Sequence, residues 1–222
     1  MLAPIVQSLP IAIGILLSST PLVAITLTLY TRGRKAAVWA FILGWVGSMA
    51  LIGGAVLVMA DTPGSGPGLP SGWVNGTRIV LGLLLLYLAL KQWRGRPQPG
   101  TEAPPPKWMR LLEGISTAKA GGLGLALVAL NPKNLLLTLS GAVAMVDASP
   151  APVAQWAALA VFTTVASLGI ASPVLAALVL GPRVVPALDG AKAWIVAKNA
   201  AIMTTVLLLL GLVVLGNGLS AL

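Results

Sequence analysis

The residue that points most directly to chemistry is a lysine deep inside an apolar stretch. Lys133 lies midway between the nearest charged residues, Lys119 and Asp147. At about 1.5 Å per helical residue, each of them is roughly 20 Å away. A lysine stem is too short to carry its ammonium to a membrane surface over that distance. Because a lysine at the centre of a spanning helix costs roughly 2.5–3.5 kcal/mol, we expect Lys133 to line a polar cavity.

The neighbours of Lys133 indicate a break in the helix that carries it. Pro132 has no backbone N–H to donate, and Asn131 and Asn134 supply amide groups on either side of the Pro-Lys pair. The free N-terminus of a half-helix carries partial positive charge and attracts anions. Asn131, Pro132, Lys133 and Asn134 therefore form a candidate substrate site that suits a phosphate, sulfate or carboxylate. The alternative is a structural lysine that neighbouring carbonyls or ordered water satisfy.

A second proline with small polar neighbours occurs in the first apolar stretch. Pro21 follows Ser18, Ser19 and Thr20, whose hydroxyls can bond the backbone groups that a broken helix leaves free. A simple kink is the alternative for Pro21 taken alone. Because Pro132 stands in the matching position of the second half, we predict that Ser18, Ser19, Thr20 and Pro21 also line the substrate pathway.

Further polar residues stand nearer the ends of the apolar stretches. Arg78 and the pair Lys198 and Asn199 occupy similar positions in the third and sixth stretches. They are expected to reach the lipid headgroups; the alternative is that they gate the two mouths of a cavity. Ser172 and Pro173 predict a kink in the fifth stretch and are possible gating residues too.

The composition argues against several kinds of chemistry. The chain has no cysteine and no histidine, which excludes disulfides, thiolate chemistry and histidine-ligated metals. Its acidic residues all lie outside the centres of the apolar stretches, so a carboxylate metal cage or proton relay is not expected. No group is placed to activate a hydroxyl. We therefore expect no catalytic residue, no metal and no cofactor, and predict that the protein is not an enzyme.

The apolar stretches themselves predict a membrane protein. Apolar residues make up 57% of the chain and charged residues only 9%, and the mean hydropathy is +0.95. Six stretches are long enough to span a membrane. They cover residues 5–30, 37–60, 75–92, 120–146, 153–180 and 194–220. The net charge is +9, but the basic residues lie beside these stretches and so do not indicate a nucleic-acid partner.

The distribution of basic residues predicts the topology. Lysine and arginine gather after the first, third and fifth stretches, whereas the opposite side has only Arg78, near the start of the third stretch. By the positive-inside rule, both termini face outward and the basic loops face the cytoplasm. We therefore expect a multi-pass protein of the inner (plasma) membrane. The first stretch lacks a basic region before it and a cleavage site, so it is interpreted as a retained helix.

The two halves of the chain resemble each other. The matching positions are Pro21 with Pro132, Trp39 with Trp156, and Trp73 with Trp194. Since each half holds three stretches, the halves must cross the membrane in opposite directions. The fold prediction is an all-α, polytopic membrane protein built as two inverted three-helix repeats, with both prolines facing each other near the midplane. Repeat one covers about 1–93, a cytoplasmic loop about 94–119 and repeat two about 120–222, within a single membrane domain.

A stripe of small residues runs along the second stretch. Ala36, Ala40, Gly44 and Ser48 recur every four residues, a spacing that lets helices approach closely. Packing within one chain is the ordinary interpretation, and a homodimer interface is the alternative.

Several segments resemble a known family of exporters. The run 129–137, with Asn-Pro-Lys-Asn at its centre, resembles the signature of the LysE superfamily. The likeness is closer to its actinobacterial branch, the GAP family, which includes the sulfolipid-addressing and peptidoglycolipid-addressing proteins. This sequence places Thr20 between Ser19 and Pro21, where the family shows a Ser-Pro pair. The likeness also covers 17–22, 41–45, 172–175, 186–189 and 193–203.

The resemblance implies a six-helix exporter, with a homodimer as one possible state. The branch implies export of cell-envelope glycolipids or peptidoglycolipids, and the superfamily implies small solutes such as amino acids. From the residues we favour a transporter or flippase for an anionic lipid or lipid-linked glycoconjugate, because one core cation stands in a very apolar chain. The alternatives are an exporter of a small amino-acid-like or organic-acid solute, anionic or zwitterionic, and a non-transporting scaffold for lipid export. Membrane lipids are expected partners in each case.

Overall fold

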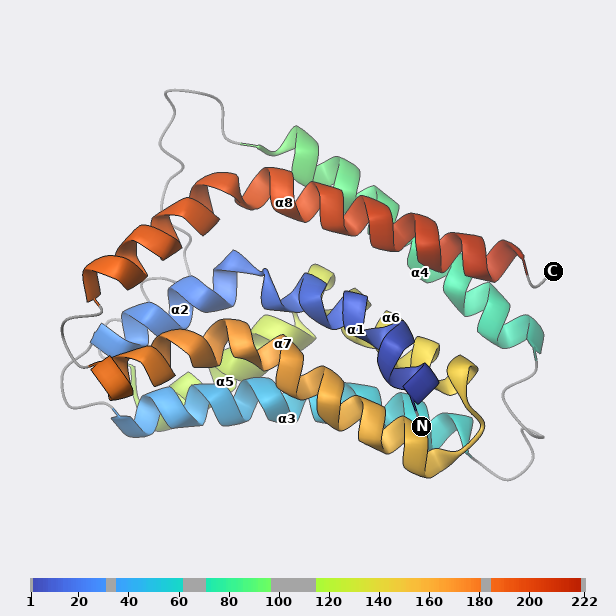
Figure 1. Cartoon of the computed structure of the whole chain (residues 1–222), viewed down its shortest axis with the longest axis horizontal. Coiled ribbons are helices and arrows are strands. Elements are labelled where there is room, and N and C mark those ends of the chain that lie inside the picture. The colour runs from blue at the N-terminus through green and yellow to red at the C-terminus, as the bar shows by residue number, and fades with distance from the viewer. Residues whose placement is uncertain (1, 31–34, 62–70, 97–114, 181–184, 221–222) are drawn as a thin grey trace.

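The computed structural model describes residues 2–30, 35–61, 71–96, 115–180 and 185–220. The centre of the predicted cytoplasmic loop, 97–114, lies outside these residues. The regular elements of the described chain are all helices, and they form an elongated bundle (Figure 1). Its elements are α1 (Leu2–Leu16), α2 (Ser19–Tyr30), α3 (Lys35–Ala60), α4 (Ser71–Arg94), α5 (Thr117–Ala129), α6 (Pro132–Ala148), α7 (Pro152–Leu180) and α8 (Val185–Leu219).

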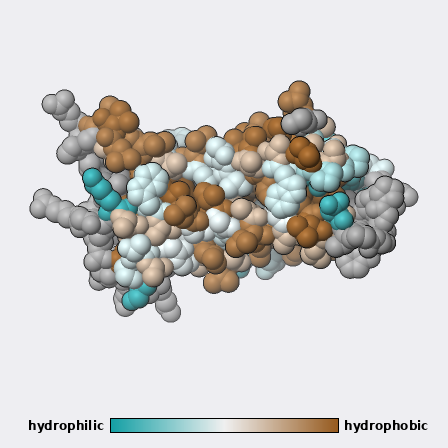
Figure 2. Space-filling view, turned by 90° about the horizontal axis from the view of Figure 1, so that it is seen from below, coloured by the Kyte–Doolittle hydropathy of each residue, from teal (hydrophilic) through white to brown (hydrophobic). Residues whose placement is uncertain are grey.

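Several elements have the length and composition of membrane spans. The helices α3 and α7 and the segment Ala197–Leu219 of α8 qualify alone, and the bent pairs α1–α2 and α5–α6 qualify if each pair is one span. The described residues thus contain three to five candidate spans, and α4 is not among them. Figure 2 shows strongly hydrophilic residues near the ends of the long axis, with a mainly apolar or weakly polar surface between them. These features confirm a helical membrane protein; the sixth span stays a prediction.

The bends fall at the two prolines that the sequence singles out. The axes of α1 and α2 differ by 54° and those of α5 and α6 by 67°. Pro132 is the first residue of α6, where its missing N–H breaks no helical hydrogen bond. The Asn131 side chain caps this helix by accepting from the Lys133 N–H at 3.1 Å. Pro21 likewise falls in the first turn of α2.

Small residues allow α3 and α5 to pack at close range. A Cβ atom on Gly44 would lie 2.0 Å from the Gly121 carbonyl oxygen, and one on Gly124 would lie 2.2 Å from the Phe41 carbonyl oxygen. The Ser48 hydroxyl donates to the Leu125 carbonyl at 3.2 Å. The small-residue stripe of α3 is therefore occupied by α5 of the same chain, as its ordinary interpretation expected.

The neighbour relations of the two halves correspond. Helix α3 packs on α5 of the other half, and α7 packs on α1. Helices α4 and α8 lie side by side along much of their length (Figure 1). The core between these pairs is filled by large buried side chains, among them Phe41, Trp45 and Phe162. This packing brings the two helix breaks into the interior of one bundle.

Candidate functional site

Lys133 joins the two helix breaks. Its Nζ atom donates to the Ser18 hydroxyl at 2.9 Å, across 115 residues of sequence. Ser18 directly precedes α2 and is buried. The same Nζ lies 3.1 Å from the Met203 sulfur on α8. The lysine ammonium therefore lies where the N-termini of α2 and α6 meet the middle of the long helix α8.

Several residues close to Lys133 and Met203 in the sequence have buried polar atoms without a hydrogen-bond partner in the described chain. Asn134, next to Lys133, is fully buried and donates to the Leu127 carbonyl at 2.8 Å. Its side-chain oxygen has no hydrogen-bond partner among the described residues, and neither do the buried side-chain oxygens of Asn199 and Thr204 on α8. Asn199 stands one turn before Met203 and Thr204 follows it. Because buried polar atoms are normally hydrogen-bonded, these atoms hold acceptor capacity that the described residues leave unused.

The electrostatics of the site favour an anion. The described residues include no acidic partner for Lys133, whose two side-chain contacts are a hydroxyl and a thioether. The N-termini of α2 and α6 add the partial positive charge of helix ends. Within the described chain the site therefore carries positive charge without a counter-ion, which is the arrangement that stabilises a phosphate, sulfate or carboxylate.

The other residues of the two breaks are placed unequally. Ser18, Ser19 and Pro21 are buried and Thr20 is partly buried, whereas Asn131 is partly buried and Pro132 is exposed. The exposure of Pro132 contradicts the expectation that both prolines face a shared interior. Pro132 takes the first position of α6 with its side chain exposed, whereas Asn134, two residues later on the same turn, is the residue that is buried and donates to the Leu127 carbonyl.

Arg78 behaves differently from its prediction. It was expected to reach the headgroups, but it is 7% exposed and forms an ion pair with Asp147 at the end of α6. The base of the Arg78 side chain on α4 packs closely against Gly218 of α8, where an added Cβ would lie 3.0 Å from the Arg78 Cβ. Lys198 is exposed, and its position at the headgroups stays a prediction.

Ser172 and Pro173 lie within the single helix α7. Pro173 cannot donate to the carbonyl of Gly169, four residues earlier. The Ser172 hydroxyl donates to that carbonyl at 3.4 Å instead. Gly169 itself lies against the end of α1, because a Cβ there would stand 2.4 Å from the Leu16 carbonyl oxygen. The proline thus lies inside one continuous helix, and both the kink and a gating role stay predictions.

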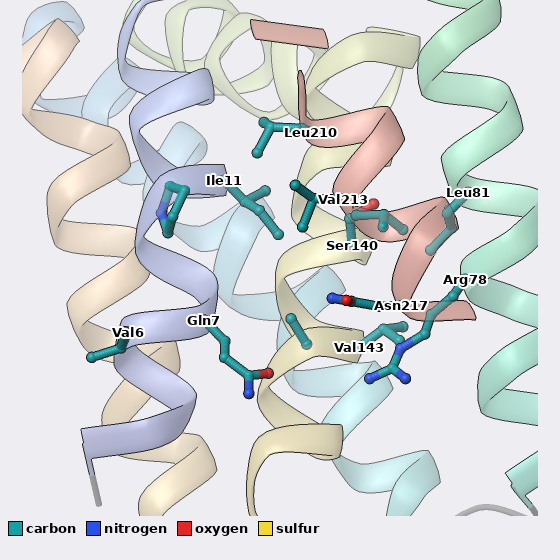
Figure 3. A pocket seen from close by; sticks show the side chains of 13 residues that line it. Val6, Gln7, Ile11, Arg78, Leu81, Ser140, Val143, Leu210, Val213 and Asn217 are labelled. Atoms are coloured by element: carbon teal, nitrogen blue, oxygen red, sulfur yellow. The ribbon is translucent and has the colours of Figure 1, made fainter. Parts of the chain in front are cut away.

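A cavity that the sequence did not predict lies between α1, α4, α6 and α8 (Figure 3). Its volume is about 290 Å³, close to the lower end of ligand pockets. We call it the α1–α8 cavity. It is lined by Val6, Gln7, Pro10, Ile11, Arg78, Leu81, Ser140, Val143, Ala144, Leu210, Val213, Val214 and Asn217. Most of these residues are apolar and match no motif, so only the packing of four helices brings them together.

Two broken helix pairs, a central lysine and an apolar surface define a helical membrane protein with a polar, cationic centre. A family model supports a more specific assignment, since it matches residues 9–220. The chain belongs to the sulfolipid-1-addressing protein (Sap) family. Comparisons with curated proteins and with solved structures gave no match.

Proposed function

We propose that the protein is a membrane transporter or flippase that exports an anionic lipid or lipid-linked glycoconjugate toward the cell envelope. The observation that carries the proposal is the Lys133 ammonium, which lies at the meeting point of two helix breaks without an acidic partner in the described chain. The name of the family, sulfolipid-1-addressing protein, supports a sulfated or otherwise anionic lipid as the substrate class.

The arrangement of the halves supports a transport mechanism. Helix α3 packs against α5, which belongs to the broken pair of the second half. In the same way α7 packs against α1, which belongs to the broken pair of the first half. We infer two inverted repeats, with α1–α2 and α5–α6 as broken spans and α4 as the sixth span. In such folds the substrate site lies near the midplane, and one half rocks against the other to expose it alternately.

In this mechanism Lys133 binds the anionic headgroup at the centre. The Ser18 hydroxyl holds the ammonium in place while the site is empty. A bound anion would add charge-assisted hydrogen bonds from Nζ and from the helix N-termini. The unpaired amide oxygen of Asn199 and the hydroxyl of Thr204 are then available for sugar hydroxyls of a glycoconjugate.

Reconstitution into liposomes tests the proposal. Fluorescent phosphatidylglycerol, a fluorescent sulfated glycolipid and radiolabelled lysine and glutamate are assayed side by side. We expect the lipids to cross faster than in empty liposomes and the amino acids to stay. Movement of the amino acids alone would favour the small-solute exporter, and movement of nothing would favour the scaffold.

Variants of Lys133 separate a binding role from a structural one. Lys133→Met should lower lipid transport at least tenfold, and Lys133→Arg should also lower it, because a planar guanidinium does not replace a compact ammonium. The matched control is Lys119→Met, which removes an exposed lysine at the start of α5. Transport by Lys133→Met at the parental rate would contradict the proposed role of the lysine.

A further inference from the structure

We propose that the α1–α8 cavity is a second lipid-binding site, which holds an acyl chain of an anionic amphiphile and binds its headgroup through Arg78. This site lies apart from Lys133, toward the end of the bundle where α1 begins and α8 ends. Binding there does not depend on the proposed transport through Lys133.

The cavity has charged and amide side chains at one end and mainly apolar side chains toward the other, with the Ser140 hydroxyl among them. In Figure 3 the side chains of Gln7, Arg78 and Asn217 point into the lower part of the space, near the start of α1. About one turn deeper lie Ile11 on α1 and Leu81 on α4, and Leu210 on α8 lies two turns deeper than Asn217. This layout matches a headgroup at the end of the bundle with a chain extending toward its centre.

The cavity also opens to the surface of the bundle. Its rim includes Val6 on α1, which is 64% exposed, and Val213 on α8, which is 57% exposed. Apolar residues on an open rim allow a chain to enter sideways from the membrane, without its charged head crossing the interior.

Arg78 is paired with a carboxylate that a bound anion can replace. Its guanidinium pairs with Asp147, whose side chain is 39% exposed while that of Arg78 is 9% exposed. A phosphate, sulfate or carboxylate headgroup competes with Asp147 for the planar fork of Arg78. The displaced Asp147 carboxylate is already close to water, so it loses little on separation, whereas the buried arginine always keeps an anionic partner. The ion pair therefore restricts the site to anionic amphiphiles.

A fluorescence binding assay tests this site in the purified full-length protein, in uncharged detergent. The probe is dansyl-aminoundecanoate, a carboxylate on one chain, and the control ligand is its uncharged methyl ester. Arg78→Gln should weaken carboxylate binding at least tenfold and leave the ester unchanged. Asp147→Asn should strengthen carboxylate binding threefold or more, because Arg78 loses its competitor. The double variant Arg78→Gln/Asp147→Asn carries no unpaired charge and should bind the carboxylate as weakly as Arg78→Gln.

Single cysteines locate the bound probe, since the chain has none of its own. Val213 lines the cavity and its neighbour Leu212, at 52% exposure, does not. The carboxylate should protect Val213→Cys from alkylation and leave Leu212→Cys unprotected. Equal protection of both, or equal binding of acid and ester by all variants, would show non-specific insertion and overturn the proposal. Lys133→Met should bind the probe normally; if it abolishes binding while Arg78→Gln does not, the probe occupies the Lys133 site and the proposal is wrong.

Discussion

The Lys133 Nζ and the Ser18 Oγ lie 2.9 Å apart, although the two residues are 115 positions apart in the sequence. Their hydrogen bond connects the α1–α2 break with the α5–α6 break. Each break needs polar groups for the backbone atoms that it frees. This side-chain hydrogen bond satisfies no backbone atom itself, but it ties the two breaks together, because Ser18 precedes α2 and Lys133 lies in the first turn of α6. Loss of either partner should therefore be felt at both breaks.

Ser18→Ala should destabilise the protein. It removes the oxygen acceptor of a charged donor, which costs about 1–3 kcal/mol. We expect a lower melting temperature in detergent and slower lipid transport, with partial recovery in Ser18→Thr. The matched control is Ser19→Ala, which alters the adjacent buried serine and leaves the Lys133 bond intact. Equal melting temperatures for Ser18→Ala and the parent would show that the bond contributes nothing.

A double-mutant cycle at Ser172 and Pro173 should reveal how α7 tolerates its proline. Ser172→Ala removes the donor to the Gly169 carbonyl and should cost about 0.5–1.5 kcal/mol. In the background Pro173→Ala the residue at 173 regains an N–H that bonds the same carbonyl. Ser172→Ala should then be nearly neutral in thermal unfolding. An equal cost in both backgrounds would disprove the coupling.

Much of the fold followed from local chemistry in the sequence. Proline next to small polar residues predicted both helix breaks, and the four-residue spacing of Ala40, Gly44 and Ser48 predicted a close helix contact. What the pattern did not contain was the partner: nothing local indicates that Gly44 meets Gly121. Which helix packs against which depends on how whole helices fit together, and the pattern of a single sequence predicts this only weakly.

The candidate site was predictable to a similar extent. Lys133 was recognisable because a charge at membrane depth is costly, and Ser18 because it stands beside a proline. The contact with Met203 was not predicted, since a methionine in an apolar helix looks like ordinary core. Arg78 was placed at the headgroups because its spacing from the helix end permits it. Its pairing with Asp147 instead arises from the packing of α4 against α6, which no spacing rule expresses.

The contact of α3 with α5 predicts opposite outcomes for two glycines three residues apart. Gly44→Ala should destabilise the protein, because its Cβ would overlap the Gly121 carbonyl and force the helices apart at a cost of about 1–3 kcal/mol or more. Gly47→Ala should be neutral or stabilising by up to about 1 kcal/mol, since no atom lies near its Cβ and alanine favours the helix. Thermal unfolding in detergent measures both. A Gly44→Ala variant as stable as Gly47→Ala would refute the close approach.

The topology can be tested with two exposed residues that are predicted to lie on opposite sides of the membrane. Asp61 follows α3 and Gly95 follows α4, and each is exposed. The positive-inside rule places Asp61 outside and Gly95, beside Lys91 and Arg94, in the cytoplasm. In intact cells a membrane-impermeant maleimide should label Asp61→Cys and spare Gly95→Cys. After permeabilisation it should label both, and the cysteine-free parent should stay unlabelled. Labelling of Gly95→Cys in intact cells, with Asp61→Cys protected, would invert the topology. Labelling of both in intact cells would mean that α4 does not span the membrane.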